Sequence, residues 1–452
     1  MSYQVPQNID PNKIFLVNRS EIKGRLDPKM ALYNKSVQQA LYPMVKLKNL
    51  LLSKPQYGAN EAGIVRENNT QPRYIRITDI DENGLISTSE LGATVANVEE
   101  KYILNKNDIL IARSGATVGK SYIHKELPYT CLYAGYLIRF LVNPDRLLPE
   151  YLFTYTQLSP YKGWVNAIQR PSAQPNINAE EYQSIEIPLP DLSKQTEIVN
   201  CLNNGYLQKQ QKEQQAEVLL NSIDDYLLGE LGIQLPDNKA QTLQDRIFTV
   251  NFSEIIDARM DPKSVLFLGE SAKSTKYDNV QLKQIAKIEK GSAITGDVVN
   301  KDGQYPVIAG GQTSPYNHDR YNFKGDIITV SASGAYSGYV WYHKDPIFAS
   351  DCSVIYAKNN QFMTKYLFEV LKAQQSHIYL LQQGAGQPHV YPDDLAKLWI
   401  PVVTLSKQQE IVGHITAIRQ QAKSLQEEGK AILEKAKKEV EAMIIGQYQN
   451  LY

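Results

Sequence analysis

The chain has 452 residues, which is enough for two or three domains that each bury a core. Its 48 Lys and Arg residues balance its 48 Asp and Glu residues, which excludes a bulk polycation and confines any nucleic-acid binding to a local surface. Three cysteines without a CxxC pair exclude a disulfide scaffold and a zinc ribbon. The sequence shows no signal peptide and no apolar run of about 18 residues, so we expect a cytoplasmic protein with no membrane partner.

One pattern occurs twice along the chain. Residues 12–22 are matched by 245–255, and residues 25–28 by 259–262. Further matches follow in the same order: 106–110 with 324–328, 114–119 with 333–338, 124–125 with 343–344, and 173–175 with 386–388. Matches in one unbroken order predict two similar modules.

Each module reads mainly as strands. Short β-branched and aromatic runs, such as 73–78, 108–113 and 339–342, are separated by Gly, Asp and Asn. A shorter helical stretch follows late in each module, at 150–156 and 364–371. Each module is therefore predicted to be an α+β globule.

Each globule is followed by a long helix of one design. Ser193 and Ser406 stand where an N-cap is expected, and Ser406 with Gln409 fits a capping box. Apolar and small residues after Ser406 alternate steps of four and three: Ile411, Ile415, Ile418, Ala422, Leu425, Gly429, Ile432 and Ala436. In the same register the first helix offers Ile198, Leu202, Gly205, Lys209, Lys212, Ala216, Leu219 and Ile223, a weaker seam with a polar middle.

A narrow heptad seam of this length needs a partner helix. Helices that end near Gly229 and Gly446 would be about 55–60 Å long. We therefore expect the two helices to pair with each other, rather than each packing only on its own globule.

These patterns together predict an α+β chain of two tandem globules, each followed by a long helix, with the helices paired as an antiparallel coiled coil. The expected segments are a first globule at 1–190, a first long helix at 191–232, a second globule at 233–403, a second long helix at 404–446, and a tail at 447–452.

No catalytic motif survives comparison of the two modules. The run at 114–121 approaches a P-loop, but it is one residue short, β-type residues follow it, and the second copy lacks the lysine. An E-x-K nuclease pattern at 21–23 has no lysine in its counterpart at 254–256. His124 and His343 have no carboxylate or nucleophile nearby in sequence, so we favour histidines that face phosphate or solvent over a general base. We expect no catalysis, metal or cofactor in this chain.

Polar, aromatic and basic residues gather on the predicted strands and loops. In 74–78 the two-residue period of a strand places Tyr74, Arg76 and Thr78 on one exposed face, with Ile75 and Ile77 in the core. Arginine and amide side chains read base edges, and lysines and loop amides hold phosphates; the alternative is ordinary solvated loop residues. The predicted DNA-binding residues are Arg73, Tyr74, Arg76, Thr78, Arg113, Ser114, Thr117, Lys120, Arg170 and Gln174 in the first module, and Gln312, Tyr316, Asn317, His318, Ser333, Tyr336, Tyr339, Gln387 and His389 in the second.

In their duplicated order these motifs resemble the specificity (S) subunit of type I restriction-modification systems. The resemblance covers almost the whole chain. It rests on the helix starts at 192–199 and 405–412 with the Ile-Pro pairs before them, and on 74–80, 108–110 with 114–115, 326–328 with 333–334, and 305–308 with 310–311. No base-reading residue carries over from the family, so the predicted contacts rest on strand facing and loop chemistry.

The resemblance implies that the globules are target-recognition domains, each reading one half of a split, asymmetric site in double-stranded DNA, and that the helices set the unread spacer. It implies two modification (methyltransferase) subunits docked on the helices, which bring S-adenosylmethionine and methylate adenine, and restriction subunits in complexes that have them. All of this places the chain in a prokaryotic cytoplasm. Because the two modules differ in their exposed residues, a palindromic site is not expected.

Three alternatives stay open. The chain could serve another modification or phage-defence assembly, which the co-purifying subunit would identify. It could be a stand-alone methyltransferase or nuclease, which S-adenosylmethionine binding by the isolated chain would revive. It could be a coiled-coil scaffold that never touches DNA, in which case charge reversal at Arg76 and Arg113 would leave DNA binding unchanged.

Overall fold

The computed structural model describes residues 16–17, 19, 28–36, 40–169, 175–235, 249, 273–295, 299–300, 302–384 and 386–446. The repeated segments 12–22, 25–28, 245–255 and 259–262 therefore lie largely outside the described residues, as do both E-x-K positions and the tail at 447–452. The described residues divide into two compact units, one drawn from 1–212 and 427–452 and the other from 213–426. Among them, no helix combines the length and the apolar character that a bilayer span requires.

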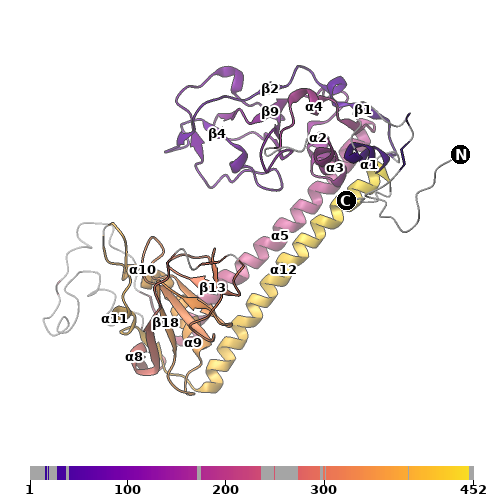
Figure 1. Cartoon of the computed structure of the whole chain (residues 1–452). Coiled ribbons are helices and arrows are strands. Elements are labelled where there is room, and N and C mark those ends of the chain that lie inside the picture. The colour runs from indigo at the N-terminus through magenta and orange to yellow at the C-terminus, as the bar shows by residue number, and fades with distance from the viewer. Residues whose placement is uncertain are drawn as a thin grey trace. The chain divides into compact units, whose positions relative to one another are not determined.

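Unit 1 builds two four-stranded sheets and a two-stranded ribbon from its described residues, in the orders β2-β9-β6-β7, β3-β5-β4-β8 and β1-β10. Neighbouring strands are antiparallel except β4 and β8, which are parallel. The strands and helices, in chain order, are α1 (Pro28–Ser36), β1 (Met44–Lys46), β2 (Gln56–Tyr57), β3 (Ile64–Val65), β4 (Arg73–Ile75), β5 (Ala93–Thr94), β6 (Ile109–Ala112), β7 (Ser121–Ile123), β8 (Cys131–Tyr133), β9 (Leu137–Phe140), α2 (Pro149–Thr156), α3 (Ser159–Ile168), α4 (Ala179–Gln183), β10 (Glu186–Pro188) and the start of α5 (Leu192–Leu231) (Figure 1).

Unit 2 repeats this plan, with sheets in the orders β12-β18-β15-β16, β14-β13-β17 and β11-β19. Its parallel pair is β13 and β17, the counterpart of β4 and β8. Its elements are the end of α5, then β11 (Asn279–Gln281), α8 (Leu282–Ile285), β12 (Ala286–Lys290), β13 (Tyr305–Ile308), β14 (Asn317–His318), β15 (Ile327–Ser331), β16 (Val340–His343), β17 (Phe348–Ala349), β18 (Cys352–Ala357), α9 (Thr364–Ala373), α10 (Gln375–Leu380), α11 (Pro392–Leu395), β19 (Trp399–Pro401) and the start of α12 (Leu405–Ile445). The duplicated α+β plan is thus confirmed.

The long helices run antiparallel within each unit. In unit 1 a Cβ built on Gly205 would lie 2.5 Å from the Cβ of Ala436, and Lys212 forms a 2.8 Å ion pair with Glu428. In unit 2 the Tyr226 and His414 rings lie 4.2 Å apart. As the residue number rises along α5, the number of the contacted residue in α12 falls. The predicted antiparallel pairing is confirmed.

Every predicted seam position on both helices is buried or half-buried. Glycine at position 205 lets the two backbones approach closely, since even one methyl group would overlap Ala436. The seam residues also enter the cores of the globules. Ile198 and Leu202 pack with Leu433 and Val440 in unit 1, and Leu227 packs with Ile411 in unit 2. The division into functional segments at residues 190, 232, 403 and 446 stays a prediction.

The N-caps differ from those predicted. Ser193 and Ser406 lie inside the first turn, because α5 begins at Leu192 and α12 at Leu405. Asp191 accepts the Lys194 backbone N–H through Oδ1 at 2.8 Å, and Thr404 accepts that of Lys407 at 3.3 Å. At each helix start a side-chain oxygen two residues before the predicted cap accepts a backbone N–H of the first turn, which has no partner within the helix.

A fully buried glutamine ties each long helix to its globule. Gln408 accepts the Met363 backbone N–H at 2.8 Å, and its amide donates to the carbonyls of Gln361 and Val403. Gln195 makes the same three bonds in unit 1, to Leu148, Arg146 and Pro190. A tyrosine adds to each anchor: the hydroxyls of Tyr151 and Tyr366 donate to the carbonyls of Pro188 and Pro401.

His124 and His343 do not face phosphate or solvent, which corrects the interpretation preferred from sequence. They are 4 % and 7 % exposed, at the ends of β7 and β16. His124 Nδ1 lies 3.0 Å from the Tyr122 hydroxyl, and His343 Nε2 lies 2.8 Å from the Thr329 hydroxyl. Burial lowers the pKa of each from 6.5 to about 4, because desolvation disfavours the charged imidazolium.

Substituting Gln408 with Ala should lower the free energy of unfolding of the chain by about 2 kcal/mol, because it leaves a buried amide and two carbonyls without partners. Chemical denaturation followed by circular dichroism measures the change. Gln409→Ala is the matched control, since Gln409 is exposed on the same turn. Equal effects of the two substitutions would contradict the anchoring role of Gln408.

The two buried histidines should make stability fall as pH drops from about 6.5 to about 4. In this window the histidines of the unfolded chain bind protons, whereas those of the folded chain stay neutral. The free energy of unfolding therefore decreases as pH falls. Urea midpoints at pH 7 and pH 5 measure the loss. The double variant H124Q/H343Q should show a shallower pH dependence than the wild type. Identical slopes for the two chains would rule out this origin.

Candidate nucleic-acid interface

A glycine loop joins β6 to β7 in unit 1. Gly115 and Gly119 have φ of 82° and 87°, a left-handed conformation that favours glycine. The Gly119 N–H donates to the Ala112 carbonyl at 2.9 Å, which closes the loop as a strand-to-strand connection. A strand follows the loop, and the Lys120 ammonium donates to the Ile80 carbonyl at 2.8 Å. This geometry is not that of a P-loop, which opens a helix.

Unit 2 has the same loop between β15 and β16. Gly334 and Gly338 have φ of 86° and 92°, and the Gly338 N–H donates to the Ser331 carbonyl at 2.7 Å. The structure also corrects the match drawn between residues 106–110 and 324–328. Strand pairing sets Leu110 opposite Tyr122 and Thr329 opposite Trp341, so Asp108 corresponds to Ile327, one residue along. Asp108 and Asp326 each directly precede a strand, β6 and β15, but the strand register shows that they do not correspond.

Arg73 and Tyr74 are buried, which corrects the predicted exposed face at 74–78. They are 1 % and 2 % exposed. Arg73 donates to the Ser87 carbonyl at 2.6 Å, and the Tyr74 hydroxyl donates to the Ala59 carbonyl at 2.7 Å. Strand β4 ends at Ile75 and a 3-10 turn follows, so the two-residue period does not continue to Thr78. β4 lies between β5 and β8, with both faces covered.

The other predicted residues of unit 1 fall into three groups. Arg76 and Thr78 are exposed, and Arg76 forms a 2.9 Å ion pair with Asp79. Arg113, Thr117 and Lys120 are half-buried on or beside the glycine loop, and Ser114 is buried there. Arg170 and Gln174 lie outside the described residues. The glycine loop therefore gathers four of the eight described residues of the predicted set.

In unit 2 the predicted residues come from three segments that meet at Ser333. Gln312, Tyr316, Tyr336 and Gln387 are exposed, and Asn317, His318, Ser333, Tyr339 and His389 are half-buried. Ser333 pairs with His389 in an isolated β-bridge. A Cβ built on Gly310, two residues before Gln312, would lie 2.6 Å from the Ser333 carbonyl. None of the described Asp, Glu, His and Cys side chains group in a way that could hold a metal ion.

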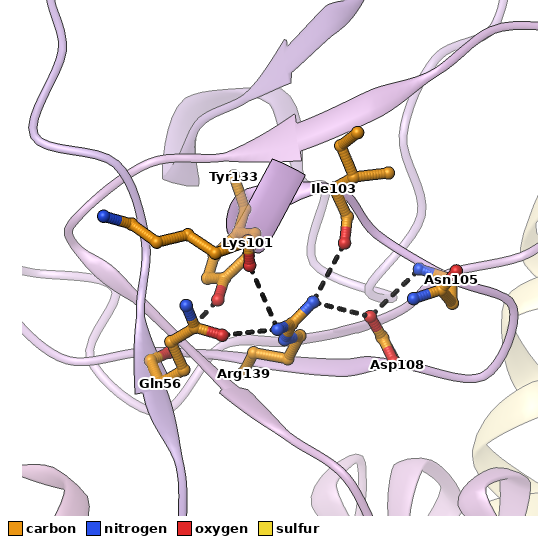
Figure 2. A network of polar contacts seen from close by, with 7 residues as sticks. All are labelled: Gln56, Lys101, Ile103, Asn105, Asp108, Tyr133 and Arg139. Carbon is orange, nitrogen blue, oxygen red and sulfur yellow. Dashed lines mark hydrogen bonds and ion pairs between the residues drawn. The ribbon is translucent and has the colours of Figure 1, made fainter. Parts of the chain in front are cut away.

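A half-buried arginine organises the strands beside the glycine loop of unit 1 (Figure 2). Arg139, on β9, donates to the carbonyls of Ile103 and Lys101, forms a 3.3 Å ion pair with Asp108, and bonds the Gln56 side chain. Burial raises the pKa of the Asp108 carboxyl despite the nearby guanidinium. Arg139 is 12 % exposed in its side chain, so this cation holds the fold together and is not offered to a ligand.

Sequence inspection missed several side chains that the structure places beside the glycine loops: Tyr57 and Tyr136 in unit 1, and Lys290, Asp351 and Tyr391 in unit 2. No local motif marks them. These residues share a position at a strand end or a tight corner. Two of them, Tyr136 and Tyr391, also expose large aromatic rings, at 62 % and 47 %.

Comparison with known proteins identifies the duplicated unit. The family model described as "Type I restriction modification DNA specificity domain" matches residues 61–221 and again 275–435. A putative type I specificity subunit of Mycoplasma pneumoniae is 28 % identical over 170 residues, which is 36 % of this chain and 67 % of that protein. The specificity subunit of the type I restriction enzyme StySPI of Salmonella potsdam is 28 % identical over 145 residues, which is 31 % of this chain and 28 % of that protein. The matched part thus spans from about a quarter to two thirds of these relatives.

One solved chain, from a structure of the type I R-M system, matches with a TM-score of 0.52 over 89 % of this chain and 96 % of that chain. At 13 % identity this likeness is one of fold. The family model matches well over half of the residues, in one segment that lies mainly in unit 1 and one that lies mainly in unit 2, and the chain therefore belongs to the type I restriction-modification DNA specificity family.

Proposed function

We propose that this chain is the non-catalytic subunit that selects the DNA sequence for a type I restriction-modification complex. The observation that carries the proposal is the duplicated specificity domain, with one glycine-loop frame in each unit and different side chains around it. One frame with two sets of side chains suits two different half-sites. Each unit would read one half of a bipartite, asymmetric site in double-stranded DNA.

The chemistry would belong to partners. Two modification subunits would dock on α5 and α12, bind S-adenosylmethionine and methylate adenine, and restriction subunits would join in complexes that have them. This chain would hold no cofactor and would act in the cytoplasm of a prokaryotic cell. The predicted contacts divide by type. Arg76, Arg113 and the side-chain amides of Asn and Gln would contact bases, whereas Lys120 and the backbone N–H groups of the glycine loop would contact phosphates.

Co-expression with the cognate modification subunit, followed by mapping of methylated adenines across the host genome, tests the proposal. We expect one bipartite motif whose two halves differ and are separated by unspecified bases. An empty vector and the modification subunit alone are the controls. A continuous palindrome, or methylation without any motif, would contradict the proposal.

Removing one heptad from each of α5 and α12 should shorten the unspecified spacer or abolish methylation, and leave both half-motifs unchanged. Seven residues keep the seam in register, because the heptad is its repeat. Methylation mapping of this variant measures the spacer directly. A change in the bases of either half-motif would show that the helices do not act as a spacer.

A further inference from the structure

The glycine loop of each unit sits at a junction built by the same backbone hydrogen bonds. In unit 1 the Arg113 N–H donates to the Tyr136 carbonyl, its carbonyl accepts the Ile177 N–H, and the Gly115 N–H donates to the Pro175 carbonyl. In unit 2 Ala332 makes the matching bonds with Asp351 and Val390, and Gly334 bonds Pro388. These distances lie between 2.8 and 3.1 Å in both units. The two junctions are therefore one backbone frame.

The side chains differ at four corresponding positions of this frame. The pairs are Arg113 and Ala332, Tyr136 and Asp351, Tyr57 and Lys290, and Asn176 and His389. The last two pairs follow from strand register and from the bridges to Ser114 and Ser333. A common frame whose functional groups are exchanged is what two different half-sites require.

In unit 2 the junction opens into a crevice of about 490 Å³. Its lining includes Lys290, Asp351, His389 and Tyr391. The Asp351 carboxylate accepts a hydrogen bond from the Ser333 hydroxyl, which orients it. The His389 and Tyr391 rings stack 6.0 Å apart at 23°, forming a flat wall beside it. The crevice thus combines one oriented acceptor, one cation and one aromatic wall.

In unit 1 the corresponding place holds a cation. The Arg113 guanidinium lies 4.8 Å from the centre of the Tyr57 ring, and its buried Nε has no hydrogen-bond partner among the described residues. Tyr57 is held in turn: its hydroxyl accepts the Ala179 N–H at 3.1 Å, and its neighbour Gln56 is bonded by Arg139. The Arg113 fork is therefore positioned before any ligand arrives.

We propose that this junction is the base-reading site of each unit: Asp351 accepts a hydrogen bond from an exocyclic amino group of cytosine or adenine in one half-site, and Arg113 donates to a guanine in the other. This inference rests on the proposed function and names the groups that perform it. Because DNA phosphates repel a carboxylate, Asp351 is favourable at a DNA surface only where it meets a hydrogen-bond donor on a base edge. Lys290 lines the same crevice and reduces the repulsion between Asp351 and the DNA phosphates. Tyr57 and Ser333 are positioning residues.

The test uses the complex with its modification subunit and duplexes that carry the mapped motif. In the half-site that unit 2 reads, the amino group of each cytosine or adenine, other than the methylated adenine, is removed in turn with 2-pyrimidinone or purine analogues. One deletion should weaken wild-type binding about ten-fold and leave the Asp351→Ala complex, which has lost the acceptor and is already weakened, unchanged. Whether the sensitive position is a cytosine or an adenine identifies the base that Asp351 contacts. If no deletion separates wild type from Asp351→Ala, the assignment of Asp351 is wrong.

Genome mapping supplies the second readout. Asp351→Ala and the milder Ser333→Ala should relax one position of one half-motif, Arg113→Ala should relax one guanine of the other, and Asp302→Ala, at an exposed acid of unit 2 outside the crevice lining, should change neither. Thermal melting shows that each variant is folded. A wild-type chain without a bipartite motif would overturn the proposed function itself, whereas a wild-type motif that all three junction variants leave unaltered would overturn only the base-reading site.

Discussion

Burial of the narrow seams on α5 and α12 is the constraint on which the rest of the structure depends. Each helix carries its buried residues in steps of three and four, too thin a stripe for a helix that stands alone. The antiparallel arrangement places an end of each helix in each unit. Ile198 and Leu202 therefore meet Leu433 and Val440 in one core, and Leu227 meets Ile411 in the other. The first globule completes its core with residues from the end of the chain, more than two hundred positions away.

Polar anchors turn this packing into a defined attachment. The fully buried Gln195 and Gln408 each satisfy one amide and two carbonyls beside a helix start, where unpaired buried backbone groups are costly. Unit 2 adds an ion pair to this attachment. The Arg419 guanidinium, on α12, forms two bonds of 2.6 and 2.7 Å with Glu369 of α9, a carboxylate only 1 % exposed. Removing that arginine would leave the buried carboxylate with only the longer 3.5 Å ion pair to Lys365, so Arg419 stabilises the attachment of the second globule to α12.

The glycine loops show how the same backbone frame, repeated in both units, can carry different side-chain chemistry. Backbone bonds at Gly115 and Gly334 need only the backbone and a left-handed φ, which leaves the adjoining side chains free to differ. Arg113 stacked on Tyr57 presents donors, whereas Asp351 held by Ser333 presents an acceptor. Placing the variable groups on hydrogen-bonded corners, instead of on long loops, keeps each one oriented.

The sequence by itself determined what depends on neighbours along the chain: the duplication, the α+β character, the two glycine loops and the heptad seams. These follow from residue type and short-range spacing. It misplaced the helix caps by two residues, extended β4 past Ile75, and put His124 and His343 at the surface. Tertiary structure decided those points, because burial depends on what packs against a residue. It alone also brought Lys290, Ser333, Asp351 and His389 to one crevice. Those residues span about a hundred positions, and no local pattern records which strand ends will meet.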